Sequence, residues 1–509
     1  MPQHVIRTIC KATLLTATLL AIGCSDSTHN STAATRTNAD EQQRLHHAGR
    51  WITDDQGRVV ILHGVNMMNK FAPYHPAALG FDDDDIAKIA AEGFNTIRLG
   101  FIWKGLEPQP GQYDMQYLAA LHETARKAGE AGLWVLMDFH QDMWNEKFNG
   151  EGAPDWASID DGLPAQPNIG FPLNYFVMPA LWRAYDHFFS FDHGPDGRVL
   201  ADALADAWRV VAQEFRTLPR LVGYDLFNEP FPGSTYPLCA NPVGCPTEDA
   251  KLTEVNRRLA QVVRKADPAT MVFYEPFVTF DFGAATFHGD LGDDLAQGFT
   301  FHNYCLAAQP GLPPPPSELT AICGPTGEQM VFNNAEAQSR KTGNALLLSE
   351  FGATDDLTSI ERMVNLADSN LVSWQYWAWW NRDPSAPRDS EGIIRDISKA
   401  PTADTLKQDK LDVLVRPYPQ LVSGTPISFN FDRASRTFNL TYNAAKADGS
   451  GQFPAGSITR IWVPKRQYPN GYQVKIIGGR VLSNKGAEAL EIQSNSGKGD
   501  IVITVGSAR

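Results

Sequence analysis

The chain lacks the features that mark several protein classes. Its 509 residues include only six cysteines, and they contain no heptad pattern, no long repeat and no nucleotide-binding motif. Basic residues are in the minority, since 44 Lys and Arg stand against 58 Asp and Glu, for a net charge of −14. This charge argues against nucleic acid as a partner and gives no general attraction to anionic membranes. With 43% hydrophobic residues, a chain of this length can form one large domain and a smaller one.

Residues 1–23 have the pattern of an export signal. Arg7 and Lys11 precede the apolar stretch 12–22, which is too short to span a bilayer. Two interpretations of the cleavage point stay open. The small residues before Cys24 suit ordinary signal cleavage, whereas a cysteine directly after a glycine also resembles a bacterial lipobox, in which that cysteine is lipidated. We expect a protein exported from a bacterium, either anchored to a membrane through Cys24 or secreted.

Residues 24–45 predict a flexible tether, because they are rich in Ser, Thr, Asn and Ala and show no apolar period. Removal of residues 1–23, which carry two positive charges and no negative one, would change the net charge from −14 to −16. We expect the exported chain to act as a monomer.

Four cysteines lie beyond the signal and Cys24, namely Cys239, Cys245, Cys305 and Cys323. An even number in an exported protein indicates two disulfides. Three pairings are possible. We favour the local one, Cys239 with Cys245 and Cys305 with Cys323, because each pair brackets a loop rich in Pro and Gly. A metal site is the alternative, but no His stands at ligand spacing around these cysteines.

Residues 46–410 alternate short apolar runs with helical patterns. The runs that we interpret as strands are Val59–Met67, Thr96–Phe101, Leu133–His140, Leu221–Glu229, Met271–Pro276, Gly298–Tyr304, Ala345–Phe351 and Val372–Trp379. The helical patterns between them are Asp82–Glu92, Met115–Ala131, Ala201–Arg216, Glu248–Ala266, Asn334–Thr342 and Thr358–Asp368. Eight strands alternating with helices predict a (β/α)8 TIM barrel. The alternative is a doubly wound sheet, which would need a Gly-rich phosphate loop after its first strand, and His63-Gly-Val-Asn66 is not one.

Residues 411–509 have a different pattern, in which period-two apolar runs are separated by Gly, Asn, Asp and Ser. The predicted strands are Ile427–Phe431, Thr437–Tyr442, Ser457–Val463, Gln473–Ile477, Ala489–Gln493 and Asp500–Val505. Short alternating strands of this kind predict a C-terminal β-sandwich. We find no catalytic constellation in it. Either it stabilises the barrel by packing, or it binds a glycan or a lipid surface.

Polar groups end nearly every strand of the predicted barrel. Glu229 and Glu350 each close an apolar run, and the other groups at strand ends are Asn66, Arg98, His140, Asn228, Glu275, His302, Tyr304 and Trp377. A charge within an apolar run costs several kcal/mol unless it is paired. In a TIM barrel, the carboxyl ends of the strands carry the chemistry. Two acids facing one sugar are what glycoside hydrolysis requires.

These motifs support a family resemblance. Asn228-Glu-Pro230 at one strand end and Ser349-Glu-Phe-Gly352 at a later one, with Arg98, His140, His302, Tyr304 and Trp377 in this order, resemble glycoside hydrolase family 5. Within that family, Gly64-Val-Asn-Met67, Asp138-Phe-His-Gln-Asp-Met-Trp144, Tyr224-Asp-Leu-Phe-Asn-Glu-Pro230, His302-Asn-Tyr-Cys305, Trp377-Ala-Trp-Trp380 and Arg416-Pro-Tyr-Pro419 look like the endoglycoceramidases. Those enzymes cleave the β-glycosidic bond between the glycan and the ceramide of glycosphingolipids, and they have a C-terminal β-sandwich.

The resemblance implies roles for individual residues. Glu229 would be the acid/base and Glu350 the nucleophile of a retaining mechanism. Arg98 would keep Glu350 ionised, with Tyr304 donating a hydrogen bond to the same carboxylate. The implied substrate contacts are Asn228 to the sugar 2-OH, His140 to a sugar hydroxyl, Trp377 under the scissile sugar, and Lys70 and Asp142 to the glycan. His302 would orient Glu229 or bind substrate. Such a mechanism requires no metal and no organic cofactor.

Several alternatives stay open. A glucosylceramidase-type relative would act on glucosylceramide alone, and a β-1,4-glucanase or mannanase would use the same barrel on soluble glycans. A glycan-binding lipoprotein without catalysis is the non-enzyme alternative, although both glutamates and their supporting residues are present. Glu275 fits a buried structural pair or a site residue. The aromatic insertion 145–189 fits either a lid or wall of a lipid channel or plain packing.

Overall fold

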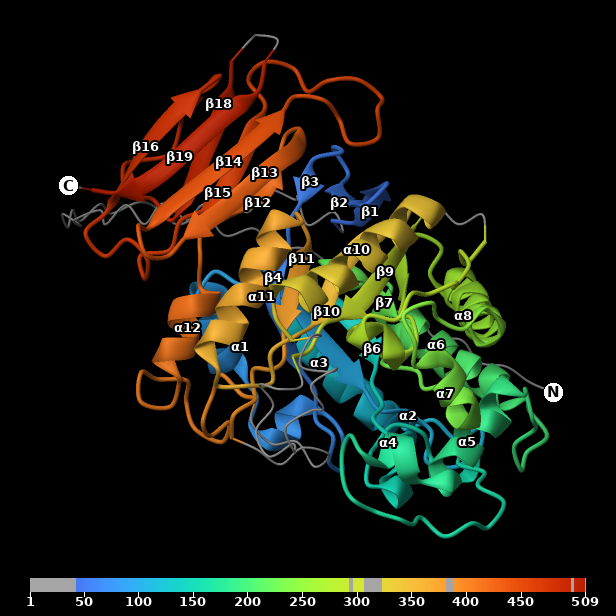
Figure 1. Ribbon diagram of the computed structural model, residues 1–509. Helices are drawn as coiled ribbons and strands as arrows, with labels where there is room; N and C mark the ends of the chain where they lie inside the picture. Colours follow the sequence, from blue (N-terminus) through green and yellow to red (C-terminus); the bar gives the residue numbers. More distant parts are fainter. Residues whose placement is uncertain (1–42, 293–295, 306–322, 381–388, 496–498, 509) are drawn as a thin grey trace, which may run out of the picture. The chain divides into compact units, whose positions relative to one another are not determined.

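Eight parallel strands close into a barrel (Figure 1). The computed structural model describes residues 43–292, 296–305, 323–380, 389–495 and 499–508. The barrel strands are β4 (His63–Met67), β5 (Thr96–Phe101), β6 (Trp134–Phe139), β7 (Leu221–Asp225), β8 (Met271–Tyr274), β9 (Gln297–His302), β10 (Ala345–Glu350) and β11 (Ser373–Tyr376). Every residue of these strands is buried, which explains their near-continuous apolar runs. The predicted TIM barrel is confirmed, in place of the doubly wound alternative.

Helices surround the barrel and extend its loops. The longer ones are α1 (Asp83–Ala91), α3 (Met115–Glu130), α5 (Pro179–Phe189), α6 (Leu200–Phe215), α8 (Pro246–Ala266), α10 (Pro325–Thr342) and α11 (Leu357–Ser369). The shorter ones are η1 (Pro76–Leu79), α2 (Trp103–Leu106), η2 (Glu146–Phe148), η3 (Asp155–Ala157), α4 (Asn174–Val177), η4 (Gly233–Thr235), α7 (Tyr236–Cys239), η5 (Val278–Phe282) and α12 (Gln408–Leu414). Among the residues that the structure describes, no helix combines the length and the apolar character that a membrane span requires.

Local chemistry fixes where several helices begin. The Asp82 side chain accepts the backbone N–H of Asp84, and Asp85 reaches back to the N–H of Asp82, so α1 starts with a capping box. Asp114 and Asp356 accept backbone N–H groups at the starts of α3 and α11 in the same way. These caps set the orientation in which each helix leaves its loop, and α1, α3 and α11 each present a buried face.

Two antiparallel sheets pack face to face beyond the barrel. The first has the order β1 (Leu45–Ala48), β2 (Trp51–Asp54), β3 (Val59–Val60), β12 (Tyr418–Val422), β15 (Ile458–Trp462), β18 (Ala489–Ser494) and β17 (Gly479–Val481). The second has the order β13 (Thr425–Asp432), β14 (Thr437–Asn443), β19 (Ile501–Ser507) and β16 (Tyr472–Ile477). Side chains of both sheets, among them Phe429, Leu440, Ile461 and Ile492, share one buried cluster. This arrangement is the predicted β-sandwich.

The first sheet draws on both ends of the chain. Val59 and Val60 of β3 pair with Val422 and Leu421 of β12. The sequence pattern predicts a barrel domain that begins at residue 46, whereas the structure has residues 45–60 extending a sheet of the sandwich. Strands of two to four residues are too short to display an alternating pattern, so the sequence gives no sign of this pairing.

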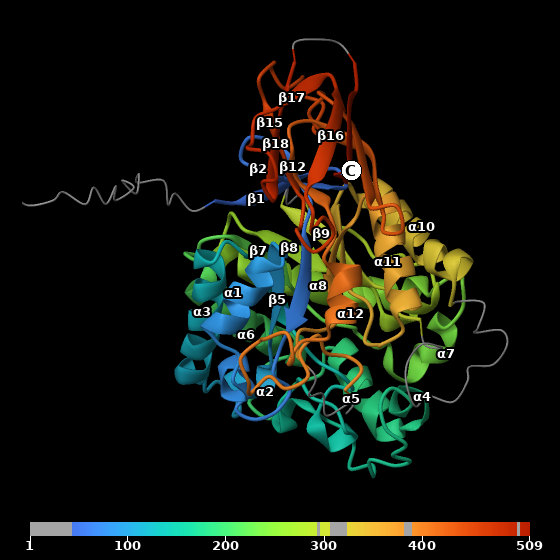
Figure 2. The same cartoon turned by 90° about the vertical axis from the view of Figure 1, so that its left-hand side faces the viewer.

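Buried polar contacts join the sandwich to the barrel, and both lie within one compact unit, Gln42–Arg509. Tyr418 of β12 donates a hydrogen bond to the carbonyl oxygen of Gly93, at 2.8 Å. Arg416 forms an ion pair with Asp368 of α11 at 2.9 Å, and Arg466 pairs with Glu92 at 3.0 Å. In both views, the strands of the sandwich lie on the side of the barrel opposite to α4 and α5 (Figures 1 and 2).

Candidate active site

Arg98 is the centre of the polar cluster inside the barrel. Its guanidinium is completely buried on β5. It donates hydrogen bonds to Asp225 at 3.0 Å, to Asp138, Glu275 and Asn228 at 2.9 Å each, and to Glu350 at 2.5 Å. Burial alone would lower the pKa of Arg98, but the four carboxylates around it raise that pKa well above its usual value. Arg98 is therefore a permanent cation that holds four acids, which come from β6, β7, β10 and the end of β8, in one geometry.

Glu350 ends β10 and is held from two sides. Arg98 binds its Oε1, and the hydroxyl of Tyr304 donates a hydrogen bond to its Oε2 at 2.8 Å. The two donors each bind one oxygen of the same carboxylate and so fix its orientation. The raised pKa of Tyr304, which follows mainly from burial and then from the charge of Glu350, keeps this hydroxyl protonated as a donor. The arrangement prepares Glu350 to act as a nucleophile.

Glu229 lies four residues beyond the end of β7, in a turn with a φ of 40°. A non-glycine residue in this left-handed region needs support from its surroundings. The backbone N–H of Glu229 donates to Glu275 Oε2 at 2.9 Å, and Gln141 Nε2 donates to the carbonyl oxygens of Asn228 and Glu229. Glu275, whose role the sequence left open, thus binds both Arg98 and the backbone of Glu229.

The side chain of Glu229 has the properties of a general acid. Burial, followed by the nearby charge of Glu350, raises its pKa to about 7, while His302 opposes the increase. His302 Nδ1 lies 2.7 Å from Glu229 Oε1. Burial would lower the pKa of His302, but Glu275, Glu350 and Glu229 raise it well above its usual value. His302 is therefore a cation that donates to Oε1, which leaves Oε2 of Glu229 to carry the proton.

The spacing of the two glutamates is set by the same imidazole. His302 Nδ1 is 2.7 Å from Glu229 Oε1 and 3.6 Å from Glu350 Oε2. The two oxygens are therefore separated by no more than the sum of these distances. This limit on one pair of oxygens is compatible with the ~5–5.5 Å between the carboxyl groups of retaining glycosidases. The geometry therefore permits a double-displacement reaction with a covalent intermediate.

A second group of side chains lies beside the acids. Lys70 contacts Asp142 and lies 3.2 Å from Glu151, and its ammonium is 4.7 Å from the ring centre of Trp377. The ring of His140 stacks on Trp377 at 5.1 Å, with 17° between the planes. Burial would raise the pKa of Asp142, but Lys70 and His140 lower it. The flat Trp377 ring, bordered by charged groups, suits a sugar that presents C–H groups to the ring and hydroxyls to its edge.

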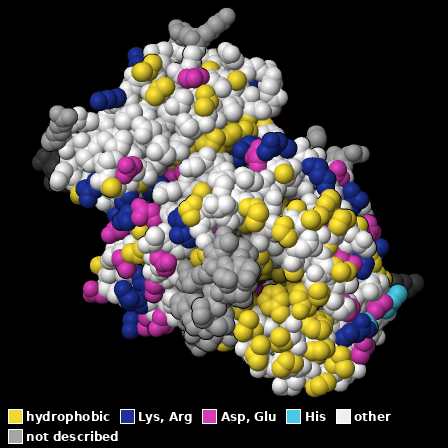
Figure 3. Space-filling view, in the orientation of Figure 1, with side chains coloured by type: hydrophobic (Ala, Val, Ile, Leu, Met, Phe, Trp, Pro, Cys, Tyr) yellow, Lys and Arg dark blue, Asp and Glu magenta, His cyan; other side chains and the backbone are white. Residues whose placement is uncertain are grey.

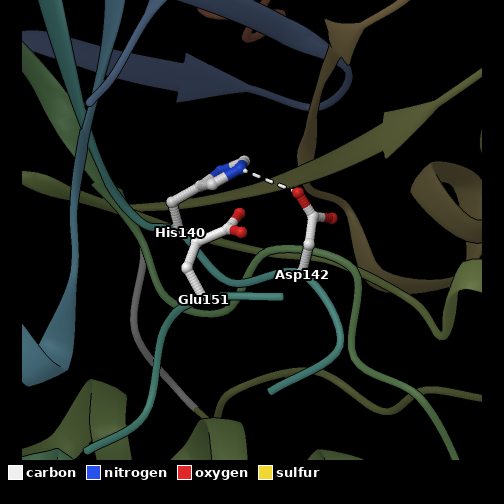
Figure 4. A group of neighbouring side chains, drawn as sticks. All are labelled: His140, Asp142 and Glu151. Carbon is white, nitrogen blue, oxygen red and sulfur yellow. Dashed lines mark ion pairs between the residues drawn. The ribbon is translucent and has the colours of Figure 1, made fainter. Parts of the chain in front are cut away.

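Two sets of side chains have the composition of a metal site. One is His140, Asp142 and Glu151, and Figure 4 shows their polar atoms pointing toward one another. The other is Glu229, Asp281 and His302. The Lys70 ammonium already contacts both carboxylates of the first set, and His302 is a cation in the second. These resident cations neutralise the acids and would repel a divalent ion, so the residues do not fit a metal.

The structure brings together the site residues that the sequence singles out. Arg98 lies within β5. The others are at the carboxyl ends of barrel strands or in the loops that follow them, namely Lys70, His140, Asp142, Asn228, Glu229, His302, Tyr304, Glu350 and Trp377. Asn228 uses two of its polar atoms for contacts within the protein. Its Oδ1 accepts from Arg98 and its Nδ2 donates to the carbonyl oxygen of Gln141, so one amide hydrogen is left for a sugar hydroxyl.

Several residues of the site are not among those predicted from the sequence. Asp138 and Asp225 hold Arg98 from within β6 and β7, and an acid inside an apolar run was a usable signal for both. Glu151 and Glu391 come from loops with no regular pattern, and Asp281 comes from the short helix η5, so the sequence offered no signal for them.

Both predicted disulfides are present in the structure. Cys239 pairs with Cys245, with their Cα atoms 4.7 Å apart, and Cys305 pairs with Cys323 at 4.8 Å. Cys305 follows Tyr304 directly, so the second disulfide anchors the end of the segment that carries the hydroxyl donor to Glu350. Cys24 and the signal lie outside the described residues.

Comparison with known proteins agrees with the geometry. Residues 53–383 match the family Cellulase (glycosyl hydrolase family 5). The chain belongs to glycoside hydrolase family 5. It is therefore a glycosidase. Residues 416–505 match the glycoside hydrolase family 5 C-terminal domain, which corresponds to the sandwich.

Individual relatives are similar over nearly the whole chain. Endoglycoceramidase I of Rhodococcus hoagii (strain 103S) is 31% identical over 468 residues, which are 90% of this chain and 87% of the relative. The endoglycoceramidase of Cyanea nozakii is 28% identical over 77% of this chain and 79% of the relative. Endo-glycoceramidase II from Rhodococcus sp., solved as a lactosyl-enzyme intermediate, matches with a TM-score of 0.72 and 26% identity, covering 90% of this chain and all of that one.

Proposed function

We propose that this protein is an endoglycoceramidase, a retaining hydrolase of the bond between the glycan and the ceramide of glycosphingolipids. The observation that carries the proposal is the pair Glu229 and Glu350, each with a carboxylate oxygen within 3.6 Å of His302 Nδ1. The substrate class follows from similarity over 90% of the chain to endoglycoceramidase I, and from a related structure that was solved with the ganglioside GM3 at 25% identity and a TM-score of 0.71.

The first step uses both acids at once. A carboxylate oxygen of Glu350 forms a bond to the anomeric carbon while the bond from that carbon to the ceramide oxygen breaks. Glu229 gives its proton to the departing oxygen, so ceramide leaves as a neutral alcohol. The negative charge that appears on Glu229 is stabilised by the His302 cation, whose Nδ1 lies 2.7 Å from Oε1.

The second step returns the enzyme to its initial state. Glu229, now a carboxylate, removes a proton from a water molecule, and the water oxygen displaces Glu350 from the anomeric carbon. The two inversions together retain the configuration of the sugar. Arg98 and Tyr304 receive the carboxylate of Glu350 when it is released, because both donors are in place before the reaction starts.

Product analysis tests this function. The purified enzyme would be incubated with lactosylceramide, glucosylceramide, the ganglioside GM3 and soluble cello- and manno-oligosaccharides, followed by mass spectrometry. We expect intact oligosaccharide and free ceramide from the longer glycolipids, and no turnover by Glu350→Gln. Hydrolysis of glucosylceramide alone would instead indicate a glucosylceramidase, an activity named for a Rhizopus delemar relative that is 24% identical over 37% of this chain. Hydrolysis of the soluble glycans alone would refute the lipid substrate.

We also propose that the chain is exported and anchored through a lipid on Cys24, with free secretion as the alternative. The apolar stretch 12–22 after two basic residues supports export, as do the two disulfides, which form in oxidising compartments. Metabolic labelling with a radioactive fatty acid tests the anchor. Label in the wild type and none in Cys24→Ser is the expected result, whereas unlabelled wild-type protein in the medium would favour secretion.

A further inference from the structure

Two long segments of the chain carry no charged side chain and no histidine. They are residues 163–182 and 230–247. The first holds α4 and the start of α5, and the second holds η4 and α7. The structure joins them, because the Tyr236 hydroxyl donates to the carbonyl oxygen of Phe176 at 3.1 Å and its ring lies 5.6 Å from that of Trp182. The two segments therefore lie side by side.

The surface of these segments is unusually apolar for one in contact with water. Ile169 is 55% exposed and Leu238 is 66% exposed. Partly exposed aromatic rings lie between them, and the surface that we call the apolar rim consists of Ile169, Phe171, Phe176, Trp182, Tyr236 and Leu238. Figure 3 shows a broad hydrophobic area over α4 and α5 without basic or acidic side chains inside it. Contiguous exposed apolar areas of this kind mark interaction sites more often than single exposed residues do.

The apolar rim is connected to the catalytic acid. Phe231 is two residues beyond Glu229 and is fully buried. Its ring lies 5.6 Å from that of Tyr236 and 4.9 Å from that of Tyr175, which precedes Phe176 in the chain. The rim follows β6 and β7 in sequence, and Figures 1 and 2 both show α4 and α5 beyond the carboxyl ends of the barrel strands. The rim and the active site thus belong to the same face of the barrel.

The composition of the rim fits a lipid layer better than a protein. Trp and Tyr side chains concentrate at the boundary between headgroups and hydrocarbon, where an apolar ring with one polar tip is stable. Protein interfaces are enriched in Arg and have a polar border, and the two segments offer no charge at all. The net charge of −14 gives no electrostatic attraction to an anionic membrane, so apolar insertion is the contribution that remains.

We propose that the apolar rim inserts into the lipid monolayer that contains the substrate and thereby places the active-site opening at the level of the sugar–ceramide bond. The inference rests on the proposed function for the identity of that layer. It does not depend on the lipid anchor at Cys24, because the anchor would hold the enzyme near a membrane through a tether, whereas the rim would orient its catalytic face.

Vesicle sedimentation tests the rim without requiring turnover. The protein would be the full-length chain with Cys24→Ser, so that no acyl chain contributes, mixed with phosphatidylcholine vesicles with and without lactosylceramide. The rim variant is Ile169→Ser with Leu238→Ser. The control is Ile427→Ser with Ile477→Ser in the sandwich, where the exposures of 47% and 68% are closely similar. We expect the rim variant to bind vesicles at least about tenfold more weakly than the control variant.

Turnover then separates the two proposals. The rim variant should hydrolyse a soluble aryl lactoside within about twofold of the wild-type rate while it loses about tenfold on vesicle-bound lactosylceramide. Binding should be insensitive to salt and to added anionic lipid, since no charge pairs form. Equal vesicle binding by rim and control variants would overturn the rim proposal. If vesicle binding depends on the rim but no glycolipid is cleaved by any form, the rim proposal stands as a lipid contact and the proposed function fails.

Discussion

His302 Nδ1 lies 2.7 Å from Oε1 of Glu229, and this contact opposes the increase in the pKa of the general acid that burial produces. The balance leaves Glu229 with a pKa of about 7. A cation at this position therefore has two effects. It keeps the acid from becoming so weak that it cannot deliver its proton, and it stabilises the carboxylate that must act as a base in the second step.

The pH dependence of kcat/KM should show this balance. Glu229 must be protonated to act, so activity declines as the pH rises through its pKa, and we expect the alkaline limb near pH 7. In His302→Gln the neutral amide no longer favours the ionised carboxylate, which raises the pKa of Glu229 and moves that limb to higher pH. A limb that stays in place in His302→Gln would contradict the assignment of Glu229 as the acid that His302 tunes. The same profile for the soluble aryl lactoside avoids effects of vesicles.

The hydroxyl of Tyr304 should contribute to catalysis through Glu350. Tyr304→Phe removes the hydrogen bond of 2.8 Å to Oε2 and leaves the hydrogen bond from Arg98 to Oε1 in place. A hydrogen bond to a charged group contributes about 1.5–3 kcal/mol, so kcat/KM should fall roughly 10- to 100-fold. Tyr472→Phe is the matched control, since its hydroxyl donates to the carbonyl oxygen of Ala487 in the sandwich. Equal activities of the two variants would exclude a role of Tyr304 at the nucleophile.

The barrel could be predicted from the sequence because its strands are buried on both faces. A run such as Ala345–Glu350 is apolar throughout and stops at an acid, and the acid marks both the strand end and the site. The same reasoning located Glu229 only approximately. The predicted strand continued to this residue, but β7 ends at Asp225 and the intervening turn carries the left-handed φ at Glu229.

Other parts of the site could not be predicted, because they depend on contacts between distant segments. Glu391 lies in a loop without a periodic pattern. Only folding brings its carboxylate to the indole N–H of Trp377, which follows β11 directly. The addition of β1–β3 to the sandwich is a pairing across more than 350 residues, between Val59 and Val422. No local pattern in either segment specifies its partner. The rim was visible only in part, as an aromatic insertion at 145–189, because its second half follows Glu229.

The two disulfides should differ in their effect on stability. Each closes a loop, and the restriction of the unfolded chain increases with loop length. Cys239–Cys245 spans 6 residues and Cys305–Cys323 spans 18, so the chain-entropy relation predicts losses of about 2 and about 3 kcal/mol when each pair is replaced by Ser. Urea denaturation of the double-Ser variants measures this difference.

Activity distinguishes the two disulfides further. Cys305 follows Tyr304, so loss of this bridge should lower kcat by releasing the segment that carries the donor to Glu350. Cys239→Ser with Cys245→Ser should leave kcat for the soluble substrate within about twofold. Equal losses of activity in both variants would indicate a general effect on folding rather than a local one.

Glu391 should fix the orientation of Trp377, the ring expected to lie under the scissile sugar and here called the sugar platform. Its Oε2 accepts a hydrogen bond from Trp377 Nε1 at 3.2 Å. Lys410 of α12 holds the segment that carries Glu391. Its ammonium donates to the carbonyl oxygens of Ser390 and Gly392 and forms an ion pair with Asp355 at 2.9 Å. The platform therefore depends on an acid in an irregular loop and on a buried lysine behind it.

Glu391→Leu would remove the acceptor of the Trp377 indole N–H and leave Lys70 and His140 as the remaining polar contacts described for this ring. A platform that contacts the sugar in both the ground state and the transition state affects KM more than kcat. We expect KM for the aryl lactoside to rise roughly tenfold, about 1.4 kcal/mol, with kcat changed little. Glu391→Gln keeps an oxygen acceptor for the indole N–H and should recover most of the loss. Failure of Glu391→Gln to do better than Glu391→Leu would show that the carboxylate charge, rather than the hydrogen bond to Trp377, is what the site requires.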